Sequence, residues 1–431
     1  MIVEPDIETC SEDRLLAALT EQVNGPKWLG EMRGLARKRF ADLGFPTTRD
    51  EDWRFTNVSP LKELEFSPAE TDPSAQLEGC LFGSLEGPRL VFVNGFYSAD
   101  LSRVGDLPNG VQVGSVAKAL AQHESVFKNH FTHRDTDAFA ALNTACFTDG
   151  AFVRVPDGVA METPIRIYYL STAGDGTTAN IRSLIVVGEN SQATVVESWS
   201  GRDTAYFNNA ITEMIVGDNA QVEHTKFQDE STSAFHVAGL HVRMGRDSRA
   251  THHSIAIGGR IARNNIRAHL DGQGLEAVLN GLYLPRGEQL IDHHMVVDHA
   301  QPHCVSHEYF NGILDDHARG VFHGRIHVHK GADQTDAKQT NKNLLLSDSA
   351  MVDTKPQLEI YADDVKCTHG ATVGQMNPEQ IFYMRARGLT EENARHMLMH
   401  AFAGEIIERI ACEPVREELD RLVWDRLEKK G

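Results

Sequence analysis

The spacing of hydrophobic and polar residues changes twice along the chain. In the first part, apolar residues recur at helical spacing over three stretches, and we predict helices over Glu12–Val23, Lys27–Leu43 and Val116–Lys128. Between the last two, Leu90–Asn94 is a short apolar run that suits a strand. From about Phe152 the helical period is replaced by short β-branched runs separated by Gly, Asn and Asp, and at Asn377 helical spacing returns. The pattern predicts a strand-rich core between two regions that contain helices.

Residues that begin and end helices support these limits. Ser11 stands where an N-cap is expected, and Gly44 follows the second predicted helix. Near the C-terminus, Asn377-Pro378-Glu379-Gln380 has the order of an N-cap, an N1 proline and a Gln at N3, and Gly388 suits the left-handed residue after the helix. Thr390 is expected to cap a second helix, and a third covers Arg416–Lys429. The apolar stripe predicted on the second helix consists of Met397, Leu398, Ala401, Phe402, Ile406 and Ile410.

The strand-rich part contains an internal repeat. Each copy is an apolar strand, a polar turn, a small residue and a second strand; the small positions are Ser191, Ala220, Ser248, Gly274, Ala318 and Ala350. Most of the intervals between them are similar, whereas the interval from Gly274 to Ala318 is much longer. A period near 28 predicts stacked coils that share one core, and the long interval suggests an insertion in one coil.

The repeat sets the expected limits of the regions. We expect a β-helix or related solenoid from about 150 to 366, with a long β-sandwich as the alternative. The expected regions are 1–145, mixed and mainly helical, 146–366, the solenoid, and 367–431, helical.

Composition excludes several kinds of partner. The formal net charge of −19 disfavours nucleic acid and anionic membrane surfaces, which attract Lys and Arg. The sequence has no run of about 18 apolar residues and no signal-peptide pattern at its start. Its six cysteines are scattered without a CxxC pair, which favours reduced thiols and a cytoplasmic location.

Familiar catalytic motifs are missing from the sequence. It contains no GxxxxGK[ST] loop, GxGxxG fingerprint, GxSxG elbow or HExxH helix. One enzymatic alternative stays open: a β-helix polysaccharide lyase or a metal-dependent hydrolase that uses the strand histidines. Asp315, Asp316 and Arg319 offer the ingredients of a lyase site, although a role in a turn fits them better.

Histidines are concentrated in the strand region. Fifteen of the 21 lie between His224 and His329. His327 and His329 are two residues apart and would point to the same face of a strand, a spacing that can chelate a metal. We favour an exposed solenoid face without metal, because no carboxylate or cysteine is expected in register with them. The adjacent pairs His252-His253 and His293-His294 would point to opposite faces.

Cys367 and His369 form a second pair at the same spacing. On an extended strand, the thiolate and the imidazole would face the same side and suit iron or zinc. Two ligands are too few for a closed site, so further donors would have to come from elsewhere, including another chain. Taken by itself, the pair fits a buried thiol beside a hydrogen-bonded histidine better than a metal site.

Several segments of the chain share one resemblance. They are Thr354–Gly374, Asn377–Gly388, Ala141–Val159, Val296–Val328 and Gln339–Asp348, with Arg49–Arg54 a weaker match. Together they resemble the SufB/SufD family of iron–sulfur cluster assembly proteins. His369-Gly370-Ala371 is similar to the SufD branch, since the SufB branch usually has a glutamate where Gly370 stands. Thr368 replaces the serine common in SufD.

The resemblance implies a fold, partners and a site. It implies a right-handed parallel β-helix flanked by helical regions, acting as a non-catalytic scaffold that joins a SufB-like paralogue near its C-terminal end and docks a SufC-like ABC ATPase. It implies that His369, with Cys367 as the weaker candidate, contributes to transient iron or cluster binding at the junction of the two chains, and that no cofactor is tightly bound. The expected partner interface includes Asn377, Phe382, Tyr383, Arg385 and Arg387. Without the paralogue, the exposed sheet edge is expected to pair with a second copy, and a homodimeric interaction module without metal is a third alternative.

Overall fold

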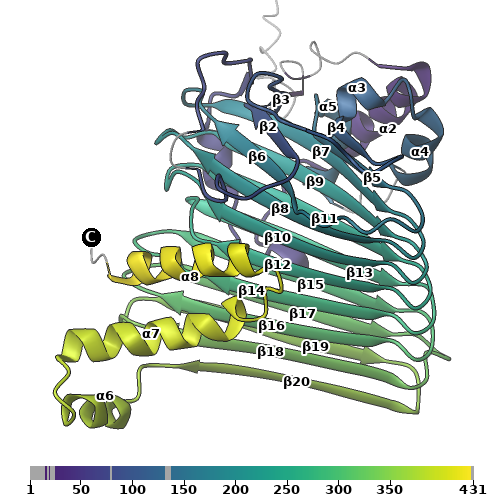
Figure 1. Ribbon diagram of the computed structural model, residues 1–431. Coiled ribbons are helices and arrows are strands. Elements are labelled where there is room, and N and C mark those ends of the chain that lie inside the picture. Colours follow the sequence, from purple (N-terminus) through teal and green to yellow (C-terminus); the bar gives the residue numbers. More distant parts are fainter. Residues whose placement is uncertain (1–14, 17–18, 20–24, 78–79, 132–136, 429–431) are drawn as a thin grey trace, which may run out of the picture.

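Two mainly parallel β-sheets stacked face to face form the body of the molecule (Figure 1). The computed structural model describes residues 15–16, 19, 25–77, 80–131 and 137–428. Sheet A, in the order of its strands, consists of β19 (Met351–Ile360), β17 (Arg319–Val328), β15 (Leu290–His299), β13 (Ile261–Leu270), β11 (Phe235–Met244), β9 (Phe207–Val216), β7 (Thr177–Val187), β5 (Ala151–Val155) and β4 (Gln112–Ser115), with β1 (Ser67–Pro68) beside β7. Sheet B consists of β20 (Val365–Gly374), β18 (Thr335–Leu345), β16 (Val305–Leu314), β14 (Glu276–Tyr283), β12 (Arg249–Ala256), β10 (Gln221–Asp229), β8 (Gln192–Gly201), β6 (Ile165–Ser171), β2 (Arg89–Val93) and β3 (Phe96–Tyr97).

Successive strands alternate between the two sheets, so the chain winds as a parallel β-solenoid. Each strand inside the stack pairs with the strand one coil earlier and one coil later, as β11 does with β9 and β13. Alternate residues point inward, and those of both sheets fill one continuous apolar core. The predicted solenoid is therefore confirmed, and the β-sandwich alternative is wrong.

The corner residues explain the repeat and correct one part of its interpretation. Asn190, Asn219 and Asp247 have φ between 54° and 57°, and each precedes a buried small residue at the start of a sheet B strand. Gly274, with φ 70°, is equivalent to these turn residues and not to the small residues that follow them. Ala318 precedes β17 of sheet A, so the long interval from Gly274 to Ala318 crosses from one edge of the solenoid to the other. It spans one and a half coils and contains no insertion.

The N-terminal region packs on the outer face of sheet A at the start of the solenoid (Figure 1). Its helices are α2 (Lys27–Leu43), the 3₁₀ turns η1 (Glu51–Trp53) and η2 (Ser59–Glu63), α3 (Val116–Ala119), α4 (Glu124–His130) and α5 (Ala138–Cys146). The predicted helix at 27–43 and the strand near 90–94 are confirmed. The single helix predicted over 116–128 is wrong: His123 leaves the helical conformation and its ring stacks on Phe152, which separates α3 from α4. The helix predicted over 12–23 lies largely outside the described residues.

The C-terminal helices are α6 (Pro378–Arg385), α7 (Glu391–Ile407) and α8 (Glu413–Glu428). Of these, α7 and α8 cover the outer face of sheet B, and α6 packs against α7. The predicted caps are present, since the Asn377 and Thr390 side chains accept hydrogen bonds from the backbone N–H groups of Glu379 and Asn393. The predicted apolar stripe of α7 is partly wrong: Met397 and Ala401 are exposed, and the buried residues include Met399, Ala403 and Ile407. Because α7 packs on sheet B and also against α8, which lies beside it on the same sheet (Figure 1), it buries two faces and leaves a third open.

The last strand extends the solenoid beyond its predicted limit. β20 runs to Gly374 and thus passes the predicted end at 366, so Cys367 and His369 lie in the solenoid and not in the helical region that follows. The loop 375–377 then leads directly into α6.

Candidate functional site

The final coil of the solenoid is uncovered. β20 is hydrogen-bonded to β18, and β19 to β17, and among the described strands neither has a partner on its other side (Figure 1). No residue of β20 is fully buried, whereas β14, inside the stack, is almost entirely buried. Half of the backbone N–H and C=O groups of a parallel edge strand point away from the sheet. This end of the molecule is therefore a template for another strand.

Cys367 and His369 both lie on the core-facing side of this edge. They are in register with Ala337 and Gln339 of β18, which are both buried. The Cys367 side chain packs in the small apolar cluster that contains Ile326. Burial, followed by the negative charge of Asp336, raises the pKa of the Cys367 thiol, so the protonated form is favoured in this chain by itself. The His369 ring is exposed at the open end.

Within the described residues, the pair lacks a third ligand from its own chain. Groups of three or more His, Cys, Asp or Glu side chains with converging ligand atoms occur at two places, and neither includes Cys367 or His369. A metal at this end would therefore need donors from a second molecule.

A buried carboxyl group stands behind His369 in the same column of inward-facing residues. Glu308 of β16 is in register with Gln339, and Gln339 is in register with His369. Glu308 and His369 are therefore two strand spacings, roughly 10 Å, apart. The Gln339 amide nitrogen donates a hydrogen bond to Glu308 Oε2. Burial raises the pKa of Glu308 to about 8, and the bond from Gln339 offsets only part of this effect. A neutral carboxyl group and an amide therefore connect the core to the open end, an arrangement that the sequence pattern did not indicate.

Replacing Glu308 by Gln is expected to remove a pH-dependent loss of stability. Because the folded-state pKa of about 8 exceeds the ordinary value of 4.5, the native protein holds a proton that the unfolded chain releases. The wild-type protein should therefore lose stability as the pH rises from 4.5 to 8, on the order of 4 kcal/mol. Glu308→Gln should match the wild type at pH 5 and exceed it at pH 8 in urea unfolding. The exposed Glu288→Gln is the control, and an equal difference at both pH values would contradict the assignment.

A second group of buried polar side chains lies earlier in the core. Lys226 Nζ is 2.8 Å from His236 Nε2 and 2.7 Å from Asn264 Oδ1, and burial lowers the pKa of Lys226 to about 8. His224 and His252 contact each other through their Nδ1 atoms at 3.0 Å. Together with Glu197, these two histidines and Lys226 line an internal cavity of about 20 Å³, the size of one water molecule.

This internal group is separate from the column behind His369. Leu279, in register between His252 and Glu308, stands between the two sets of polar side chains.

The adjacent histidine pairs point to opposite faces, as predicted. His293 faces the core and its Nε2 lies 2.9 Å from Ser254 Oγ, whereas His294 lies on the outer face of sheet A.

His327 and His329 lie on one outer face, with ring centroids 4.2 Å apart. The expectation that no carboxylate would be in register with them is wrong, because Asp298 of β15 is the register partner of His327. The sequence did not show this pairing, since Asp298 lies a whole coil before His327 along the chain.

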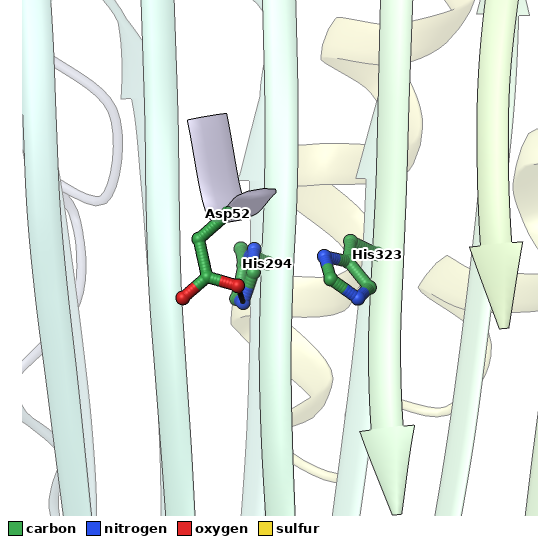
Figure 2. Close-up of side chains that lie close together, drawn as sticks. All are labelled: Asp52, His294 and His323. Carbon is green, nitrogen blue, oxygen red and sulfur yellow. Dashed lines mark ion pairs between the residues drawn. The ribbon is translucent and has the colours of Figure 1, made fainter. Parts of the chain in front are cut away.

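The N-terminal segment Arg49–Arg54 attaches its region to sheet A. Figure 2 shows the Asp52 carboxylate beside the His294 ring, with His323 on the neighbouring strand; Asp52 Oδ1 is 3.8 Å from His294 Nε2. Burial is the main reason that the pKa values of both histidines are lowered, which keeps them neutral. The cations near these two rings are Arg263, Arg267, Arg325 and Lys355. These charges oppose a bound cation.

Hydrogen bonds complete this attachment. Thr56 Oγ1 donates to Asp292 Oδ2 at 2.5 Å, and Arg263 donates to the same oxygen at 2.7 Å. The Arg263 guanidinium lies 3.8 Å from the centre of the Trp53 ring. The segment thus acts as a structural clamp between the N-terminal region and the solenoid.

The predicted partner-interface residues lie on and around α6, close to the uncovered edge (Figure 1). Phe382 and Tyr383 are 74% and 59% exposed, unusual values for large aromatic side chains. Arg387 stacks on Tyr383, with its guanidinium carbon 3.6 Å from the ring centre, and Arg385 pairs with Glu391. Asn377 acts as the N-cap of α6.

Of the residues considered for a lyase site, Asp315 and Asp316 lie in a turn and Arg319 begins β17. Asp316 has φ 54° and Asp315 lies beside it in the corner before β17. Arg319 forms an ion pair with Asp353. The arginine is therefore engaged in a structural contact between two strands, and the group serves the corner of the solenoid.

Comparison with known families identifies the chain. A family described as "SUF system FeS cluster assembly, SufBD core domain" matches residues 169–402, and the "SufBD protein N-terminal region" matches residues 18–167. This chain belongs to the SufB/SufD family. The SufB/SufD relatives include an "Iron-sulfur cluster assembly SufBD family protein" of Synechocystis, 34% identical over 95% of both chains. The "Iron-sulfur cluster assembly protein SufD" of Escherichia coli is 32% identical over 89% of this chain and 90% of its own length, and that of Bacillus subtilis is 27% identical over 95% and 96%.

Family membership supports a role in iron–sulfur cluster assembly over the lyase alternative. In the part of the chain that the structure describes, no helix is long and apolar enough to cross a membrane.

Proposed function

We propose that this chain is a non-catalytic scaffold subunit that pairs with a SufB-type chain through β19 and β20 and supplies His369 to iron or a nascent cluster at the junction. The single observation that carries the proposal is the uncovered final coil, which presents unpaired strand edges together with Cys367 and His369. Two ligands from this chain would be completed by donors from the partner, such as a thiolate.

The second half of the proposal concerns α6. Its exposed Phe382 and Tyr383, stacked with Arg387, have the composition of a protein–protein contact, in which aromatic residues and arginine are enriched. We assign this surface to an ABC-type ATPase of the SufC kind. Since only a short loop separates α6 from β20, movement of the ATPase would be transmitted to the junction.

The five cysteines among the described residues form no disulfide, which supports a reducing compartment such as the cytoplasm. In the absence of a SufB-type chain, the same edge would pair with a second copy of this chain.

The experiment is co-expression of the full chain with SufB-type and SufC-type partners, followed by affinity purification. Ala371→Lys should abolish capture of the SufB-type chain, because Ala371 is in register with the inward-facing Asn341 and the new charge would project toward the joined core. Thr372→Lys, on the other face of the same strand, is the matched control and should retain the partner.

The α6 assignment is tested in the same preparation. Phe382→Ala combined with Tyr383→Ala should lose the ATPase and retain the SufB-type chain. Loss of neither partner in any variant, or capture of the SufB-type chain by Ala371→Lys, would contradict the proposed arrangement.

A further inference from the structure

Four potential metal ligands gather on the outer face of sheet A, away from the uncovered edge. His269 of β13, Asp298 of β15 and His327 of β17 are successive register partners, each one coil after the last. His329 follows His327 by two residues and points to the same side. The solenoid thus places residues from three coils side by side near the ends of their strands.

The distances suit a single small ion. Asp298 Oδ1 lies 3.1 Å from His327 Nδ1 and 2.6 Å from His329 Nε2. Ligand atoms that bind one zinc-sized ion at about 2 Å lie about 3 Å from each other. The ligand atoms of all three residues lie within 4.8 Å of one another. The carboxylate and both rings therefore converge without a rearrangement of the strands.

The surroundings hold the carboxylate in place and leave the site accessible. His269 Nδ1 lies 2.8 Å from Asp298 Oδ2, the oxygen that the other two histidines do not use. The side chains of Asp298, His327 and His329 are 25%, 28% and 43% exposed, so an ion can reach them from solvent. The side chain of Tyr361 packs against the His327 ring from the next coil.

Charge distinguishes this site from the cluster in Figure 2. Asp52, His294 and His323 also converge, but several cations surround them. Beside the Asp298 site, Asp271 lies 3.9 Å from His269 Nε2 and adds negative charge. Arg325, on the same strand as His327, lies 4.0 Å from Glu359.

We propose that Asp298, His327 and His329 bind one divalent first-row transition metal ion, with His269 hydrogen-bonded to the ligating carboxylate. Two imidazoles and one carboxylate form the donor set of mononuclear ferrous sites and of zinc sites with open positions. A histidine that holds the second carboxylate oxygen fixes the orientation of the ligand. The site lies one coil before the final coil and does not depend on the proposed scaffold function.

The test is metal binding by the purified full-length chain. Anaerobic titration with Fe²⁺, and separately with Co²⁺ monitored by its visible absorption, should give one bound ion per chain. His329→Ala and Asp298→Asn should each weaken Co²⁺ binding by at least about 100-fold, and His269→Ala by about 10- to 100-fold. Because the His329 side chain is partly exposed, His329→Ala should fold as the wild type does, and thermal unfolding of the apo protein would verify this.

Two controls separate this site from others. His307→Ala, which changes a half-buried histidine on sheet B, and His369→Ala should both leave the affinity and the Co²⁺ spectrum unchanged. Absence of saturable binding, or binding that survives His329→Ala and Asp298→Asn, would overturn the proposal. Loss of binding in His294→Ala but not in His329→Ala would also overturn it and assign the ion to the cluster in Figure 2.

Discussion

Replacing His369 by Ala is expected to abolish iron–sulfur cluster formation by the assembled complex while leaving its subunits together. The ring is exposed at the open end of the core and shares its face with Cys367, so its removal deletes a ligand without creating a cavity. Residues that only hold a metal ligand in place change metal affinity or activity by up to about 100-fold when they are replaced. Loss of a direct ligand should have at least this effect, so we expect the cluster yield to fall by at least about 100-fold. The measurement is iron and acid-labile sulfide per complex after anaerobic reconstitution.

Neighbouring substitutions separate this role from a structural one. Thr368→Ala changes the opposite face of the same strand and should retain full cluster formation. Cys367→Ala should have a smaller effect than His369→Ala, because burial keeps the Cys367 thiol protonated in this chain. A normal cluster content in His369→Ala, or loss of the SufB-type partner in that variant, would refute the assignment of His369 as a ligand.

Replacing Arg182 by Met is expected to destabilise the protein by about 3–5 kcal/mol, because it leaves the buried Glu213 carboxylate without its buried arginine partner. The two side chains are 3% and 5% exposed, and their ion pair spans 2.8 Å between β7 and β9. Arg182 also donates to Thr144 Oγ1 at 3.0 Å, which attaches α5 to sheet A. Urea unfolding at neutral pH would measure the loss.

A double variant tests the cause of this loss. Burial would raise the pKa of Glu213, but the charge and hydrogen bond of His241 and the charge of Arg182 lower it to about 2. Glu213 is therefore ionised at neutral pH, and the stability that it contributes is present above pH 4.5 and lost as the pH falls toward 2. Combining Arg182→Met with Glu213→Gln should recover most of the stability, because no buried charge remains. If the double variant were as unstable as Arg182→Met, the hydrogen bond to α5 and not the ion pair would be the main contribution.

The helical regions show which features can be predicted from residues that are close in sequence. The N-caps Asn377 and Thr390 were predicted because a cap requires only residues close in sequence. The stripe on α7 was predicted incorrectly because its burial depends on two neighbours, sheet B and α8, that lie on different sides of the helix. The break at His123 likewise depends on Phe152, which is distant in sequence.

The repeat shows a different limit of prediction from sequence, which concerns the residues that become neighbours in adjacent coils. Both corners of a coil have the same sequence pattern, a turn followed by a small buried residue. Ala318, on one edge of the solenoid, therefore could not be distinguished by sequence from Ser248 on the other edge. The stretch of chain from Phe235 to its partner Ile261 is shorter than the stretch from Arg319 to its partner Met351. Because the coil length varies, the sequence predicts that coils stack but not which residues become neighbours.

The sequence by itself determined the solenoid, the caps of the C-terminal helices and the shared face of Cys367 and His369, because strand alternation and capping act between residues close along the chain. Only the tertiary structure decided that Asp298 meets His327 and His329, and that Glu308 and Gln339 stand behind His369. These contacts join residues about one coil apart, and their register is set by the packing of the whole core.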